Sequence, residues 1–158
     1  MTSESPSVKA HAEAPAARRV LLVAPLPPPY GGMALQARKL ENLLRAEGHA
    51  VTFVPANYPL SGVLRAFEGL PALRTAAKSA AIWRALWRLT PAVEIVHVFA
   101  ASWLYFFLVV WPAVFIGRRC GKRVVLNYRG GAGRRFFRAC GWLVRPVFKR
   151  ATVVTAPS

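Results

Sequence analysis

The chain has 158 residues, 54% of them hydrophobic, and its 22 basic side chains outnumber 6 acidic ones to give a formal net charge of +16. This length suits one folded domain, and the charge favours anionic partners, namely nucleic acid, anionic lipid or phosphorylated ligands. So few acids argue against catalysis by paired carboxylates. Cys120 and Cys140 show neither metal-ligand spacing nor a disulfide framework, so we expect no metal site and free thiols.

Residues 1–17 are polar, rich in Ala and Pro, and lack periodicity. We predict that they form a disordered lead and that residues 18–158 form one domain. The first apolar run, from residue 20 to residue 24, is too short for the core of a secretory signal peptide.

Five short apolar runs have the continuous pattern of strands that are covered on both faces. Helical patterns lie between most of them, and this alternation predicts an α/β fold, a doubly wound, Rossmann-like parallel sheet. The predicted strands are Arg19–Ala24, Ala50–Pro55, Val93–Val98, Arg123–Asn127 and Thr152–Thr155.

The first helix has an apolar stripe at Met33, Ala37, Leu40 and Leu44, and Gly48 stands where a glycine commonly ends a helix. A second helix is predicted after Pro71, from about residue 73 to residue 89. Its tryptophans fall opposite its cations. This pattern fits a surface helix whose tryptophans pack on the sheet, the interpretation we favour, or a cationic helix that lies on a membrane.

The segment Val98–Gly117 is twenty residues long without a charge, which is the length of a membrane span, and basic residues follow it. It begins directly after a strand pattern and contains Pro112. We therefore favour a buried or interfacial helix and keep a transmembrane helix as the alternative. A last helix is predicted from residue 133 to residue 150, and Pro146 should kink or divide it.

Two loops carry the pattern of a phosphate site. Gly31 and Gly32 stand between the first strand and the first helix, so a ligand can come close to the backbone at the positive end of that helix. The preceding prolines hold the loop stiff. Tyr30 is a further candidate at this site.

A second loop, Arg129-Gly130-Gly131, repeats this device after the fourth strand and adds a guanidinium that could bind a phosphate. His97, predicted to end the third strand, and Ser102 are further candidates. No catalytic residue can be assigned from the sequence.

Four segments in this order resemble the N-terminal half of family-4 (group 1) glycosyltransferases of the GT-B fold: "RRVLLVAPLPPPYGGMALQARKLENLLRAEGHAVTFV", "VEIVHV", "KRVVLNYRGGAGRRFF" and "ATVVTAPS". The resemblance implies an acceptor-side domain of a retaining enzyme that needs no metal or other cofactor and uses a nucleotide sugar as donor. Arg129 stands where that family often has a histidine. By the same resemblance, the C-terminal donor domain is missing, and this chain alone is inactive.

The function implied is transfer of a sugar to a glycan or lipid-linked acceptor in surface polysaccharide or glycolipid synthesis. The enzyme would be cytoplasmic and peripherally associated with the anionic inner surface of the membrane. Two alternatives remain, a non-catalytic membrane-associated module and a basic nucleic-acid-binding protein, the latter on charge alone.

Overall fold

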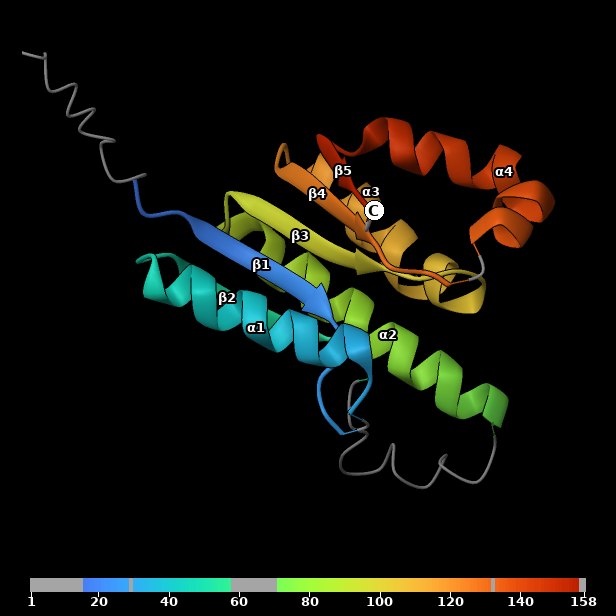
Figure 1. Ribbon diagram of the computed structural model, residues 1–158, viewed down its shortest axis with the longest axis horizontal. Coiled ribbons are helices and arrows are strands. Elements are labelled where there is room, and N and C mark those ends of the chain that lie inside the picture. Colours follow the sequence, from blue (N-terminus) through green and yellow to red (C-terminus); the bar gives the residue numbers. More distant parts are fainter. Residues whose placement is uncertain (1–15, 29, 58–70, 132, 157–158) are drawn as a thin grey trace, which may run out of the picture.

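The computed structural model describes residues 16–28, 30–57, 71–131 and 133–156. Most of the predicted disordered lead therefore lies outside the described residues. Five parallel strands form one sheet in the order β2-β1-β3-β4-β5, which confirms the predicted α/β, Rossmann-like fold (Figure 1). The strands are β1 (Arg19–Ala24), β2 (Ala50–Pro55), β3 (Ile95–Ala100), β4 (Arg123–Tyr128) and β5 (Val153–Thr155).

The third strand lies two residues later in the chain than the sequence predicts. A short 3-10 helix, η2 (Thr90–Ala92), leads into Val93, which is buried ahead of the strand. The apolar run of the sequence therefore begins before the strand itself. The prediction that His97 ends the third strand was therefore wrong, because His97 lies in the middle of β3.

The helices cover the two faces of the sheet unequally. One face is covered by α1 (Gly32–Ala46), which lies on the near side in Figure 1. The other face is covered by α2, the π-helix η3 with α3, and α4. These elements are α2 (Pro71–Leu89), η3 (Phe106–Val110), α3 (Trp111–Arg119) and α4 (Gly133–Arg150).

Alternate residues of β1 show how this arrangement is encoded. Leu21 and Val23 pack in the large core under α2, α3 and α4, whereas Leu22 and Ala24 pack in the smaller core under α1. All four side chains are buried, so the strand reads as a continuous apolar run.

The predicted start and end of the first helix are confirmed. Gly31 is the N-cap of α1, and Gly48 has a φ of +84°, a left-handed conformation that glycine adopts readily. Arg45 in the last turn complements the negative end of the helix dipole.

The favoured interpretation of the second helix was wrong. The side of α2 that packs on the core carries Ser79, Ile82 and Leu86, so the buried stripe lies beside the predicted one. Trp83 and Trp87 are 41% and 51% exposed and do not belong to either core cluster. Because isoleucine and leucine supply enough apolar surface for the core, the tryptophans are left at the surface.

The uncharged segment Val98–Gly117 is not one helix. It contains the end of β3, a turn, η3 and most of α3. Within the described ranges, no helix combines the length and the apolar character that crossing a bilayer requires. The last helix is not divided either, because α4 continues through Pro146, which lies on its exposed side.

Candidate functional site

The order in which the chain connects the strands reverses between β1 and β3, at their carboxyl ends. From β1 the chain turns to α1 on one face, and from β3 it turns to η3 and α3 on the other face. Ligands of open parallel sheets bind at such a reversal. Because all five strands are parallel, the Gly31-Gly32 and Gly130-Gly131 loops lie at this same edge, as predicted. We call it the carboxyl edge.

The proline-rich loop after β1 is held by a side chain that the sequence analysis missed. Asn57, which follows β2, accepts a hydrogen bond from the Leu26 amide at 2.8 Å and donates to the Leu26 carbonyl at 2.6 Å. It also donates to the Pro28 carbonyl at 3.0 Å. The sequence feature that could have indicated this contact is an asparagine directly after β2. The loops that follow neighbouring parallel strands emerge at the same edge of the sheet, so Asn57 can reach the loop after β1.

Gly31 and Gly32 are not required by the packing of the fold. A Cβ added at either position would meet no atom within 4 Å, and neither residue has a left-handed φ. The first intrahelical bond of α1 is donated by Leu35 to the Gly31 carbonyl at 3.1 Å, so the amides before Leu35 have no partner within the helix. Tyr30, beside them, is 78% exposed.

Packing, in contrast, requires a glycine at position 130. A Cβ there would lie 2.5 Å from Ser102 Oγ and 2.6 Å from Tyr128 Oη. These two oxygens share a hydrogen bond of 2.7 Å that joins the loop after β3 to β4. The candidate Ser102 is thus engaged with a tyrosine, whereas Gly131 has open space around it.

Arg129 is oriented by Asn127 at the end of β4. Its Nε donates to Asn127 Oδ1 at 2.9 Å, and its backbone amide donates to the Ala100 carbonyl at 2.7 Å. No other acceptor for its guanidinium occurs among the described residues. This leaves the terminal nitrogens available for an anion.

His97 lies on the sheet face that carries α1, in register with Leu22 of β1. Its ring stacks on Phe99 at 5.5 Å, and its Nε2 is buried without a hydrogen-bond partner in the described structure. Burial, and then the charge of Arg129, lower the pKa of His97 to about 4. The imidazole is therefore neutral at pH 7.

Trp103 has a φ of +60°, an uncommon conformation for a bulky residue. It stands directly after Ser102 at the carboxyl edge. Such conformations cost on the order of 1–3 kcal/mol and are found preferentially at functional sites. Nothing in the sequence around Trp103 indicates this strain.

The carboxyl edge lacks described acidic side chains. The three described carboxylates lie elsewhere. Glu41 is buried in α1 between Arg38 and Arg45, at 2.9 and 2.8 Å, while Glu47 and Glu94 lie at the opposite edge. None of α1, α2, α3 and α4 has an acid in its first turn. The positive helix ends at this edge are thus not neutralised locally, which favours an anion.

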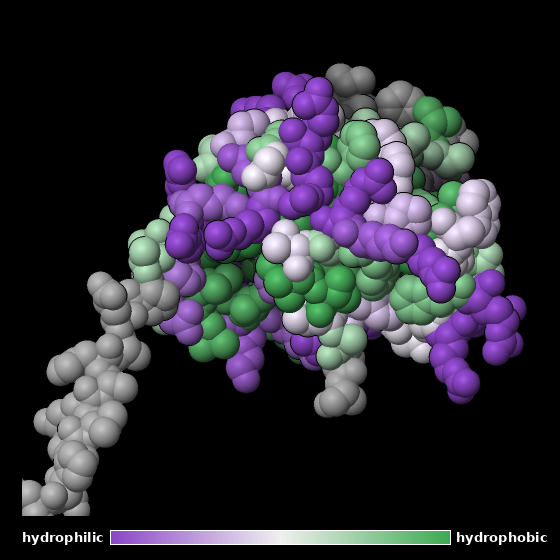
Figure 2. All heavy atoms as spheres, turned by 90° about the horizontal axis from the view of Figure 1, so that it is seen from above, coloured by the Kyte–Doolittle hydropathy of each residue, from purple (hydrophilic) through white to green (hydrophobic). Residues whose placement is uncertain are grey.

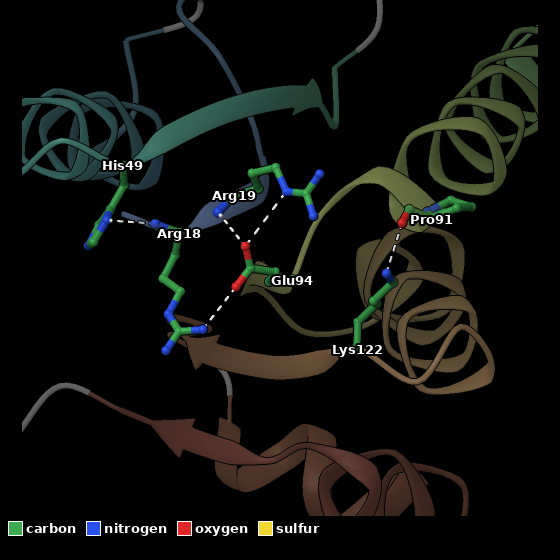
Figure 3. A network of polar contacts seen from close by, with 6 residues as sticks. All are labelled: Arg18, Arg19, His49, Pro91, Glu94 and Lys122. Carbon is green, nitrogen blue, oxygen red and sulfur yellow. Dashed lines mark hydrogen bonds and ion pairs between the residues drawn. The ribbon is translucent and has the colours of Figure 1, made fainter. Parts of the chain in front are cut away.

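At the opposite, amino edge, charges are paired (Figure 3). The Glu94 carboxylate accepts from Arg18 NH1 at 3.0 Å and lies 3.6 Å from Arg19 Nε. The hydrogen bond from Arg18 holds the pKa of Glu94 below its usual value. Lys122 Nζ donates to the Pro91 carbonyl at 2.8 Å. These groups line a cavity of about 300 Å³ in which most cations already have acceptors.

The layer formed by α2, η3, α3 and α4 exposes aromatic side chains, and we call its outer surface the helical face. Every tryptophan of the chain is at least 41% exposed, and four of the five belong to these helices: Trp83, Trp87, Trp111 and Trp142. Cavities of about 340 and 350 Å³ join Trp83 to Trp111 and Trp111 to Trp142, so these side chains share one surface.

Basic residues surround this aromatic surface, most densely on α4. Trp142, 75% exposed, falls at helical spacing between the exposed Arg138 and Lys149. The helix has no acid and carries six cations: Arg134, Arg135, Arg138, Arg145, Lys149 and Arg150. Figure 2, seen from the side of α4, shows hydrophilic side chains beside hydrophobic patches.

No family model and no curated protein matches the chain. A solved structure that resembles it is a 2-deoxyribosyltransferase from Bacillus psychrosaccharolyticus, which is 17% identical, with 72% of this chain and 74% of that chain covered and a TM-score of 0.49. At this identity the likeness concerns the fold alone.

The predicted glycosyltransferase resemblance is corrected by these comparisons. The solved structure named above is a 2-deoxyribosyltransferase and not a GT-B glycosyltransferase. The predicted sugar transfer in polysaccharide or glycolipid synthesis, with its nucleotide-sugar donor and glycan acceptor, was therefore wrong. The resemblance rested on short strand-to-helix segments with paired glycines, which the Rossmann-like architecture itself accounts for.

Proposed function

We propose that this chain is a peripheral membrane-binding domain that lies with its helical face on an anionic bilayer surface, such as the inner leaflet of a cell membrane. The exposure of the four tryptophans on this face, Trp83, Trp87, Trp111 and Trp142, carries this proposal. Tryptophan is amphipathic and is enriched at membrane interfaces, and apolar patches exposed on a soluble protein often mark interaction sites.

The charges support an anionic surface as the partner. Each basic residue close to an anionic leaflet contributes about 1 kcal/mol to binding. The α4 cations flank Trp142 on the same exposed side, so the helix can insert its aromatic ring while its cations stay at the headgroups.

Co-sedimentation with phosphatidylcholine vesicles, with and without phosphatidylserine, tests the proposal. We expect binding that requires phosphatidylserine and is partly released by salt. Trp142→Ala should reduce the partition coefficient about tenfold, since a large apolar side chain contributes about 1.5–3 kcal/mol on burial. Leu35→Ala and Lys39→Gln, on exposed positions of α1 on the other face, are the matched controls and should bind like the parent.

Duplex DNA provides the competing outcome. If the parent prefers DNA to anionic vesicles, and if Trp142→Ala weakens DNA binding alone, the domain is a nucleic-acid-binding protein. Equal losses for the α1 controls would instead show that vesicle binding does not depend on the helical face. Either result contradicts the proposal.

We propose, as a second function, that the carboxyl edge binds a phosphate group. The orientation of Arg129 by Asn127, on an edge without described carboxylates, favours this function. The guanidinium would bind the phosphate, and Gly31, Gly32 and Gly131 leave space for it to approach the backbone.

Titration calorimetry with pyrophosphate tests this site. Arg129→Gln should weaken binding by about tenfold, because a hydrogen bond to a charged group contributes roughly 1.5–3 kcal/mol. Arg123→Gln removes the same charge at the other end of β4 and should have a much smaller effect. Equal effects of the two substitutions would mean that pyrophosphate binds through net charge and not at this edge.

A further inference from the structure

Three adjoining cavities form a groove across the helical face. The first, of about 440 Å³, lies between α2 and the start of the η3 helix and shares Trp83 and Leu108 with the second, of about 340 Å³. The second shares Trp111 and Leu143 with the third, of about 350 Å³, which lies between α3 and α4. We call the three together the apolar groove.

At the end of this groove between α2 and η3, the polar side chains already donate hydrogen bonds within the protein. Ser79 Oγ donates to the Thr75 carbonyl at 2.9 Å, and Thr75 Oγ1 donates to the Pro71 carbonyl at 2.9 Å. Trp83 Nε1 donates to the Leu108 carbonyl at 2.8 Å. A peptide or a nucleobase placed here would lose hydrogen bonds to water without replacement. An alkyl chain has none to lose, so it suits the groove best.

A single cation, Arg150, lines the α4 end of the described groove. Its NH1 donates to the Pro146 carbonyl at 3.3 Å, a bond that occupies one of its five N–H donors. Lys149, one residue before Arg150, is exposed. Because the groove is apolar along its length and cationic at one end, its charge pattern matches an amphiphile with an anionic headgroup.

We propose that the apolar groove binds one alkyl chain of an anionic amphiphile, with the chain across α2, η3, α3 and α4 and the headgroup at Arg150. This inference rests on the proposed membrane function and names the ligand that the helical face would take from the bilayer. The occupant is a membrane lipid whose headgroup is a phosphate ester, and a free alkyl phosphate serves as its soluble probe.

Calorimetric titration with monomeric decyl phosphate, below its micelle concentration, tests the groove separately from the bilayer. We expect saturable binding of one molecule per chain. Leu143→Gln places an amide in the groove at a position that is 41% exposed, so the fold should tolerate it, and it should lower the affinity about tenfold. Leu35→Gln, on exposed α1, is the control that should leave the affinity unchanged.

The headgroup contact is tested by pairing Arg150→Gln with decanol. The substitution should weaken decyl phosphate about fivefold and leave decanol unaffected, since only the phosphate meets the guanidinium. Circular dichroism spectra that match the parent show that each variant is folded.

The outcomes separate the two proposals. Vesicle binding by the parent without saturable binding of decyl phosphate overturns the groove and leaves the membrane function standing. Binding of decyl phosphate that Leu143→Gln does not weaken also overturns the groove. Failure of vesicle binding removes the membrane function itself. Vesicles of brominated lipid distinguish a chain taken from the bilayer from a free alkyl phosphate. A brominated chain from the bilayer would quench Trp111, which lines the groove, more than Trp87, which does not line it.

Discussion

Asn57 holds Leu26 through both ends of its carboxamide, which accepts from the Leu26 amide at 2.8 Å and donates to the Leu26 carbonyl at 2.6 Å. One side chain after β2 thus substitutes for a backbone partner and fixes the loop after β1. This contact positions the lead-in to Gly31 and α1, and with it the carboxyl edge.

We predict that Asn57→Ala destabilises the domain by about 1–3 kcal/mol, since it leaves the partly buried Leu26 amide and carbonyl without their partner. Asn57→Asp keeps the acceptor for the Leu26 amide but sets a carboxylate oxygen against the Leu26 and Pro28 carbonyls, so its cost should be at least as large. Chemical denaturation followed by circular dichroism measures both. An Asn57→Ala variant as stable as the parent would show that water replaces the carboxamide.

Gly130→Ala and Gly131→Ala form a second matched pair. The added Cβ at Gly130 would meet Ser102 Oγ at 2.5 Å and Tyr128 Oη at 2.6 Å, and Tyr128 is buried. We expect a loss of about 1–3 kcal/mol for Gly130→Ala and little change for Gly131→Ala, which meets nothing within 4 Å. Denaturation midpoints decide between them, and similar midpoints for the two variants contradict the prediction.

Packing of α3 on the sheet gives a third prediction. A Cβ at Gly117 would lie 2.9 Å from Val124 Cγ2 and 3.3 Å from Val96 Cγ2, both in the core. Gly117→Ala should therefore lower the melting temperature. Gly141→Ala, within α4 and free of contacts, should raise it, by about 0.5–1 kcal/mol in stability, because alanine favours the helix. Thermal unfolding of both variants checks the opposite signs.

His97 should make stability depend on pH in the mildly acidic range. Burial lowers its pKa from 6.5 to about 4, so between these values the unfolded chain binds a proton that the folded chain does not. The stability from the neutral imidazole is present above about pH 6.5 and is lost as the pH falls toward 4. Denaturation at a series of pH values should show this slope in the parent and a smaller one in His97→Gln and His97→Leu. An unchanged slope in both variants assigns the effect to other groups.

The sheet could be predicted from the sequence because parallel strands that are buried on both faces appear as continuous apolar runs. Where apolar character continued past an element, the prediction failed. Val93 is as apolar as the strand that follows it, but it belongs to the turn before β3. Trp83 and Trp87 were placed on the sheet because they are large and apolar, yet Ile82 and Leu86 occupy that side.

The position of the candidate site at one edge of the sheet could be predicted from the sequence, but the roles and contacts of its residues could not. Two glycine pairs after strands predicted one edge correctly, because parallel topology fixes where loops emerge. Whether a glycine serves a ligand or the fold depends on a neighbour far along the chain. For Gly130 that neighbour is Ser102, and the pair Asn57 and Leu26 is equally remote in sequence. Hydrogen bonds of this kind leave no periodic pattern.

The exposure of the five tryptophans has a consequence for how this protein can be followed by light. Indoles already in contact with water emit at long wavelength in the native state, so unfolding should shift the emission spectrum only slightly. Transfer of Trp142 and its neighbours on the helical face into a less polar medium should shift it strongly to the blue. Intrinsic fluorescence of this chain should therefore report what the folded domain touches far better than whether it is folded.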